Sequence, residues 1–96
     1  MNFAIVCWDR ADTHDLRDAF RARHLQYVEK HRDCIQPGYP LEVDDEGIAG
    51  TLFIVDVPTQ AAAGEFAADE PFHKAGVYEF ITIEPWQQEV ALCITH

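Results

Sequence analysis

The chain has 96 residues, of which 48% are apolar, and its 17 acidic and 7 basic side chains give a formal net charge of −10. This length predicts a single domain over residues 1–96, with 85–96 as a C-terminal tail, and this apolar fraction indicates a globular rather than a disordered protein. The acidic balance argues against nucleic acid or an anionic membrane surface as a partner. The sequence contains no run of about 20 apolar residues, so we expect no membrane span.

The cysteine pattern and the first residues indicate the compartment. Cys7, Cys34 and Cys93 are odd in number and far apart in the chain. This pattern argues against a disulfide framework and favours a reducing, cytoplasmic location. The opening sequence MNFAIVCW has no basic segment ahead of its apolar residues. We therefore expect a strand here and not a signal peptide.

The first half of the chain predicts a strand, a helix and a second strand. Asn2–Trp8 is apolar at both sets of alternating positions, which is typical of a strand with two buried faces. A turn rich in Asp and Thr follows, with Asp12 or Thr13 as an N-cap, and a helix is predicted from about His14 to Arg32. Cys34–Pro40 is predicted as a short strand that the sequence PGYP interrupts.

The second half of the chain also predicts a strand, a helix and a final strand. A turn is predicted at Asp45–Gly47, and Gly50–Val57 is the clearest strand of the chain. Thr59 is a plausible N-cap for the helix that follows. The segment EPFHKAG should end that helix, since Gly76 suits a left-handed residue, and Val77–Ile83 is the last strand.

The order β-α-β-β-α-β predicts a ferredoxin-like α+β fold, with both helices on one face of an antiparallel sheet. The strands Asn2–Trp8 and Gly50–Val57, however, are apolar on both faces. The helices can cover only one of these faces. The simplest cover for the other face is the sheet of a second copy, so we expect a homodimer.

The first predicted helix places a histidine at the edge of its apolar stripe. That stripe consists of three large side chains, Leu16, Phe20 and Tyr27. His24 borders the stripe and shares one side of the helix with Arg17 and Arg21. It is a candidate acid or base because imidazole titrates near neutral pH. The alternative is a boundary histidine that donates one hydrogen bond to a carbonyl group.

The basic residues of this region suggest a binding site for a small anion. Four of the seven basic side chains lie in the first quarter of the chain, at Arg10, Arg17, Arg21 and Arg23. The alternative is ordinary pairing on the helix surface with the nearby carboxylates, Asp12, Asp15 and Asp18.

Two carboxylates, Asp69 and Glu70, end the second predicted helix, where the helix dipole disfavours anions. A nearby imidazolium would remove that penalty, and a carboxylate on one imidazole nitrogen would raise the basicity of the other. The alternative is a solvated acidic loop. A metal site at His24, His31 and Cys34 is disfavoured, because this spacing matches no standard zinc pattern.

The motifs RADTHDLRDAFRARHLQYV, PGYP, GTLFIVDV and DEPFHKAGVYEFITIEPW resemble the YCII-related family from about Asn2 to Trp86. The resemblance implies a dimeric α/β barrel and an active site built on a histidine, here His24, and an acidic residue. The family's usual Asp before Pro is matched by Glu70, with Asp69 one position earlier, so either could be the partner. The family's AGP after the first helix is PGYP here.

The resemblance also implies dehydrochlorinase-like or isomerase-like chemistry on small cyclic substrates, with no metal and no organic cofactor. We therefore expect His24 as general base, with Glu70 or Asp69 orienting it. Arg17 or Arg21 would hold an anionic substrate group. Three aromatic side chains should wall the pocket, namely Phe20, Phe72 and Trp8. The rival function is a non-catalytic module that binds a small ligand or a protein in the same cleft.

Overall fold

The computed structural model describes the backbone of residues 1–42 and 48–86 and the side chains of residues 1–35 and 49–86. The turn predicted at Asp45–Gly47 and the predicted tail beyond Trp86 lie outside the described residues. The elements follow the predicted order, in the sequence β1 (Asn2–Asp9), α1 (His14–Lys30), β2 (Ile35–Glu42), β3 (Ile48–Asp56), α2 (Gln60–Asp69), α3 (Pro71–Lys74) and β4 (Tyr78–Pro85).

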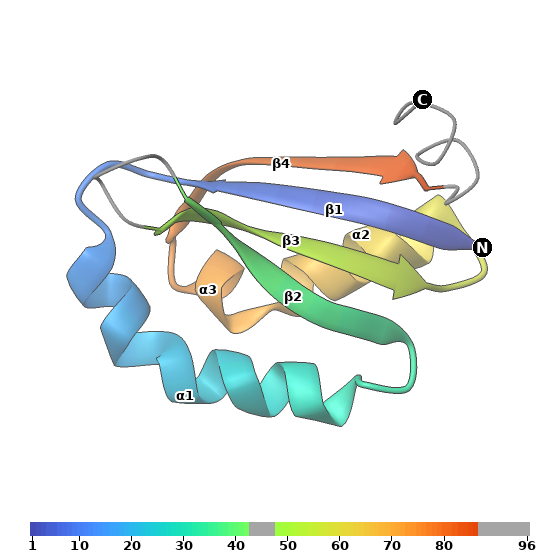
Figure 1. The fold of residues 1–96 in the computed structure, drawn as a ribbon, viewed down its shortest axis with the longest axis horizontal. Helices are drawn as coiled ribbons and strands as arrows, with labels where there is room; N and C mark the ends of the chain where they lie inside the picture. The colour runs from blue at the N-terminus through green and yellow to red at the C-terminus, as the bar shows by residue number, and fades with distance from the viewer. Residues whose placement is uncertain (43–47, 87–96) are drawn as a thin grey trace.

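The four strands form one sheet in the order β2-β3-β1-β4, and each neighbouring pair is antiparallel. The helices lie on the same side of this sheet, with the short helix α3 beside α1 (Figure 1). This is the predicted ferredoxin-like α+β arrangement. No helix in the described part of the chain is long and apolar enough to cross a membrane.

The core lies between the sheet and the helices. Strand alternation directs one set of apolar side chains towards the helices, and its buried members are Phe3, Ile5, Cys7, Phe53 and Val55. The apolar stripe of α1, Leu16, Phe20 and Tyr27, packs against this cluster as predicted, and Val28 packs there too. The helix is therefore fixed to the sheet along its length, which fixes the position of the residues beside the stripe.

Three local predictions need correction. The strand β2 continues through the PGYP sequence, with a shift of register between Gln36 and Tyr39 rather than an interruption. The segment after Glu70 is a short helix, α3, and not only a turn. Thr13 occupies the N-cap position of α1, but its hydroxyl donates to the Arg10 carbonyl and caps no helix N–H group.

The predicted cap of the second helix is confirmed, since the Thr59 hydroxyl accepts a hydrogen bond from the Ala62 N–H group at 3.1 Å. Replacing Thr59 by Ala should lower the free energy of unfolding by about 1 kcal/mol, because one N–H group of α2 loses its partner. Thr59→Ser keeps the acceptor and is the control. Urea unfolding of both variants checks this, and equal losses in both would contradict the capping role.

Candidate active site

The histidine on α1 and the carboxylate that follows α2 meet inside the domain. The Nδ1 atom of His24 lies 3.4 Å from Oε1 of Glu70, and their side chains are 13% and 1% exposed. His24 lies midway along α1, and Glu70 joins α2 to α3, which packs against α1. The expected meeting of His24 with a helix-ending carboxylate is therefore present, and the partner is Glu70.

Glu70 is fixed in place by the proline that follows it. Pro71 disfavours helix at the preceding residue, and Glu70 is extended, with φ −67° and ψ 132°. Its side chain then caps α3, and Oε2 accepts a hydrogen bond from the Phe72 N–H group at 2.5 Å. The unfavourable interaction with the α2 dipole that the sequence predicted does not apply to Glu70, because its carboxylate faces the beginning of the next helix.

The imidazole ring of His24 is held flat against Phe72. The ring centroids are 4.2 Å apart and the planes differ by 14°. The guanidinium carbon of Arg17 lies 4.7 Å from the centroid of the same Phe72 ring. Arg17 and His24 are seven residues apart, about 10 Å along the helix, so Phe72 fits between them. This stacking fixes the orientation of the imidazole ring that Glu70 contacts.

Arg17 has partners within the domain that the sequence analysis did not predict. Its Nε and Nη2 atoms donate to the two Asp9 carboxylate oxygens at 2.6 and 3.0 Å, and Nη2 also donates to the Thr51 hydroxyl at 2.8 Å. The alternative of surface pairing with Asp12, Asp15 or Asp18 does not hold for Arg17, because its side chain turns inward and is buried. Its charge is balanced by Asp9.

The other charges of this buried cluster are paired with each other, so the Glu70 carboxylate faces His24. Arg17 and Asp9 neutralise each other. Tyr78 donates its hydroxyl to Glu70 Oε1 at 2.5 Å, and burial together with the Glu70 charge raises the pKa of Tyr78, so the phenol stays neutral. Among the described residues, His24 is the only ion-pair partner of Glu70. Glu70 is therefore the carboxylate placed to balance a proton that His24 takes up.

The buried Cys7 thiol makes stability fall at alkaline pH. Burial, then the charges of Glu70 and Asp9, raise the pKa of Cys7 from 9.0 to about 12. Above pH 9 the thiol ionises in the unfolded chain but not in the folded one. The free energy of unfolding therefore falls as the pH rises from 9 towards 12. Tyr27, whose pKa is raised to about 12 mainly by burial, adds to the loss above pH 10.

We therefore expect the free energy of unfolding to fall between pH 8 and pH 10.5, with Cys7 contributing about 2 kcal/mol of the fall. Urea unfolding at the two pH values measures the fall. A Cys7→Ala variant should show a smaller fall by about that amount. An equal fall in both proteins would contradict the assignment to Cys7.

Three other predicted site residues, Asp69, Arg21 and Phe20, lie outside the His24–Glu70 contact. Asp69 is exposed, and no described ion pair joins it to His24. The Arg21 side chain is 51% exposed and pairs with Asp18. Phe20 is half-buried, with the Arg23 guanidinium 5.0 Å from its ring.

Trp8 lies on the opposite face of the sheet. Strand alternation turns Cys7 towards the helices and Trp8 away from them, where its side chain is 42% exposed. The prediction that Trp8 walls the His24 site within one chain is therefore wrong. The substrate-binding roles predicted for Phe20, Arg17 and Arg21 remain predictions.

Sequence reasoning missed three residues of the cluster, Asp9, Thr51 and Tyr78. The strand register brings them together, since Cys7 pairs with Thr51 in β3 and Asp9 pairs with Tyr78 in β4. One signal was available, because Thr51 is the polar residue on the inward face of an otherwise apolar strand. It faces the helices with Phe53 and Val55, where a hydroxyl needs a partner.

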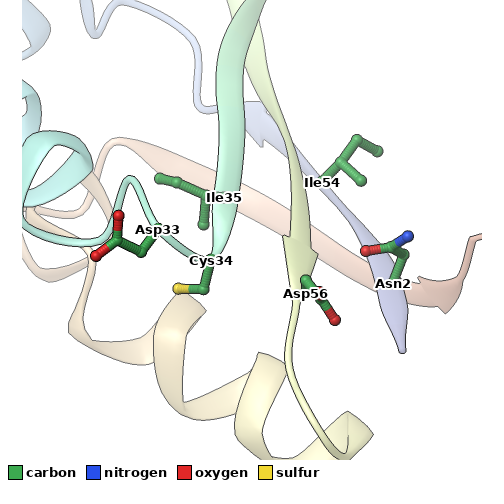
Figure 2. A pocket seen from close by; sticks show the side chains of 6 residues that line it. All are labelled: Asn2, Asp33, Cys34, Ile35, Ile54 and Asp56. Carbon is green, nitrogen blue, oxygen red and sulfur yellow. The ribbon is translucent and has the colours of Figure 1, made fainter.

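Two hollows of the described surface lie away from His24. One, of about 280 Å³, lies where the start of β1 and the end of β3 meet the start of β2 (Figure 2), and its lining residues are Asn2, Asp33, Cys34, Ile35, Ile54 and Asp56. The other, of about 490 Å³, lies beside the end of α1. Among the described residues, no group of three or more His, Cys, Asp or Glu side chains is arranged to hold a metal ion.

The fold and the cluster define a ferredoxin-like domain with a buried histidine–carboxylate pair. The family model of the YCII-related domain matches residues 1–87, so the chain belongs to the YCII-related family. Protein YciI of Escherichia coli O6:H1 is 27% identical over 96 residues, covering 92% of this chain and 98% of that protein. An uncharacterized protein of Haemophilus influenzae has the same identity and coverage.

A solved structure of similar fold is an enzyme. It is the 5-chloro-2-hydroxyhydroquinone dehydrochlorinase TftG from Burkholderia phenoliruptrix, in complex with 2,5-dihydroxybenzoquinone. Its TM-score to this chain is 0.80 at 29% sequence identity, and the match covers 91% of this chain and 94% of TftG. This likeness extends over nearly the whole of both chains.

Proposed function

We propose that this chain is a cofactor-independent lyase or isomerase that acts on a small cyclic substrate with a carbonyl or ring hydroxyl group. The proposal rests on one observation, the buried His24 Nδ1 atom 3.4 Å from Glu70 Oε1. A carboxylate at this position favours the tautomer with its proton on Nδ1, which leaves a lone pair on Nε2. Because Nδ1 is itself buried, the remaining exposure of the ring lies on its other atoms.

In the proposed reaction, Nε2 of His24 takes a proton from the substrate, and the electron pair left behind forms a new double bond. In a dehydrochlorination, chloride leaves with the electrons of its bond to carbon. In an isomerisation, the imidazolium returns the proton to a different carbon. The imidazolium that forms in either case is stabilised by Glu70, which has no other ion-pair partner among the described residues.

An anionic substrate group would be held by Arg21 rather than Arg17. Arg17 already donates to Asp9 and Thr51. Arg21 lies one turn further along α1, and its only described partner is Asp18 on the exposed surface. Phe72 supports the His24 ring and forms the wall behind it.

The test uses 5-chloro-2-hydroxyhydroquinone, the compound in the name of the similar dehydrochlorinase, as the first probe. Chloride release is measured without oxygen, because hydroquinones oxidise in air, and small unsaturated lactones form a second panel. Turnover that is lost in His24→Ala supports the proposal. Unchanged turnover in that variant excludes the catalytic role. Binding without turnover, in both proteins, favours the rival function of a ligand-binding module.

We also propose a homodimer formed through the face of the sheet that the helices leave open. Trp8 and Phe80 are direct neighbours on β1 and β4 and are 42% and 61% exposed. Val6 and Leu52 pair on the same face and are half-buried. Such a patch of large apolar side chains is typical of an interface. Light scattering should give twice the chain mass of 10.9 kDa, and a monomer at micromolar concentration would contradict the proposal.

A further inference from the structure

A row of buried polar groups connects the sheet to the candidate base. The Arg17 guanidinium donates to the Thr51 hydroxyl at 2.8 Å, and Thr51 lowers the pKa of the Tyr78 phenol. Tyr78 then donates to Glu70 Oε1 at 2.5 Å. The same oxygen atom of Glu70 lies 3.4 Å from Nδ1 of His24. Tyr78 and His24 therefore both face the same oxygen atom of Glu70.

The two contacts with this oxygen are unequal. The distance from Tyr78 is that of a hydrogen bond to a charged acceptor, whereas 3.4 Å is longer than such a bond requires. His24 Nδ1 is buried, and no described residue forms a hydrogen bond with it. A buried nitrogen without a partner is costly, so something must keep the carboxylate from closing on it. The other oxygen, Oε2, is already occupied by the Phe72 N–H group.

We propose that Tyr78 is a positioning residue: by occupying Oε1 of Glu70, its hydroxyl group sets how tightly that carboxylate holds the His24 ring. An effect of Tyr78 on catalysis rests on the proposed function, whereas its effect on the Glu70–His24 contact does not. No described hydrogen bond or ring contact joins Tyr78 to the imidazole that would react. The Tyr78 ring also meets Phe72 edge-on, but a Tyr78→Phe variant keeps that contact, so the hydroxyl group acts on His24 through Glu70.

Tyr78 remains a hydrogen-bond donor under ordinary conditions. Burial and the neighbouring Glu70 and Cys7 groups raise its pKa, and this effect is larger than the opposing effect of Thr51. The other titratable groups of the cluster do not compete for this role. Asp9 is paired with Arg17, and Cys7 is a neutral thiol because its own pKa is raised to about 12.

Without the Tyr78 hydroxyl group, Oε1 of Glu70 should accept a hydrogen bond from His24 instead. In Tyr78→Phe, a carboxylate oxygen that is almost fully buried loses its close donor, and the His24 Nδ1–H group is the nearest described replacement. The 3.4 Å contact between Nδ1 and Oε1 should then shorten to a hydrogen bond, which favours the charged form of the ring in this variant. Loss of one neutral donor predicts a shift of about 0.5 to 1 pH unit.

The experiment follows the His24 ring by NMR in protein labelled at histidine, without any substrate. In Tyr78→Phe, the midpoint of the His24 titration should move to higher pH by that amount. Tyr27→Phe is the matched control, because it also loses a buried hydroxyl bond, from Tyr27 to the Phe66 carbonyl at 2.9 Å, but none to a carboxylate. Its His24 midpoint should stay at the wild-type value. An unchanged midpoint in folded Tyr78→Phe would overturn the inference.

A second measurement applies if Tyr78→Phe does not fold. Incorporation of 3-fluorotyrosine at position 78 keeps the ring and makes the hydroxyl a stronger donor. The His24 midpoint should then move in the opposite direction, to lower pH, and no movement would overturn the inference. Neither outcome depends on turnover. If His24→Ala keeps full activity while these shifts occur, the proposed function fails and the role of Tyr78 stands.

Discussion

Replacing Glu70 by Gln is expected to lower turnover of any substrate found for this protein by about 100- to 10,000-fold. The carboxylate orients the His24 ring and balances the imidazolium that forms during proton transfer. Gln has the same shape but no charge. It also offers one acceptor oxygen where the structure uses two, for the Phe72 N–H group and the Tyr78 hydroxyl.

The matched control for this prediction is the neighbouring carboxylate. Asp69→Asn removes the same charge one residue earlier, but Asp69 is exposed and lies outside the cluster. Its turnover should stay within about twofold of wild type, since single exposed charges contribute little. Thermal unfolding of both variants separates loss of activity from loss of fold. Equal turnover losses in the two variants would contradict the assignment of Glu70 as the partner of His24.

Replacing Arg17 by Met should destabilise the fold by about 3–5 kcal/mol, a large share of the stability of a small domain. The Arg17 and Asp9 side chains are each 7% exposed and are joined at 2.6 Å, so the variant leaves a buried carboxylate without its cation. Thr51 also loses a hydrogen-bond donor. The midpoint of thermal unfolding should fall by more than about 10 °C.

Two further variants show whether the effect comes from the buried pair. Arg21→Met removes an arginine one turn away whose side chain is 51% exposed, and it should change stability by less than about 0.5 kcal/mol. The double variant with Asp9→Asn and Arg17→Met should recover part of the loss, because no charge is then left unpaired. A double variant that is less stable than Arg17→Met would contradict this account.

The architecture was predictable because the strands have clear alternating patterns. The strand predicted at Asn2–Trp8 is β1, which ends one residue later, and the predicted cap at Thr59 begins α2. The continuity of β2 was not predictable from local rules. Proline usually interrupts a strand because it lacks an N–H group, but β2 is at the edge of the sheet, where a missing donor is tolerated. Edge position is a property of the sheet as a whole.

The candidate site was predictable only in part, because half of it depends on how the strands pair. His24 and Glu70 follow from helix periodicity, from the proline after Glu70 and from the family resemblance. The supporting groups Asp9, Thr51 and Tyr78 come from three strands, and their proximity depends on register. A shift of one residue would turn each of them to the other face of the sheet. No local pattern specifies that register, so the inward partner of Arg17 could not be identified from the sequence.

The position of the proton on His24 tests the central claim most directly. Nitrogen-15 NMR of the histidine rings, recorded at a pH where the His24 ring is neutral, distinguishes the two tautomers. Orientation by Glu70 predicts a proton on Nδ1 and a free lone pair on Nε2 in the wild-type protein, with this preference reduced in Glu70→Gln. A proton on Nε2 in the wild-type protein, or the same tautomer balance in both proteins, would contradict the claim that Glu70 prepares His24 as a base.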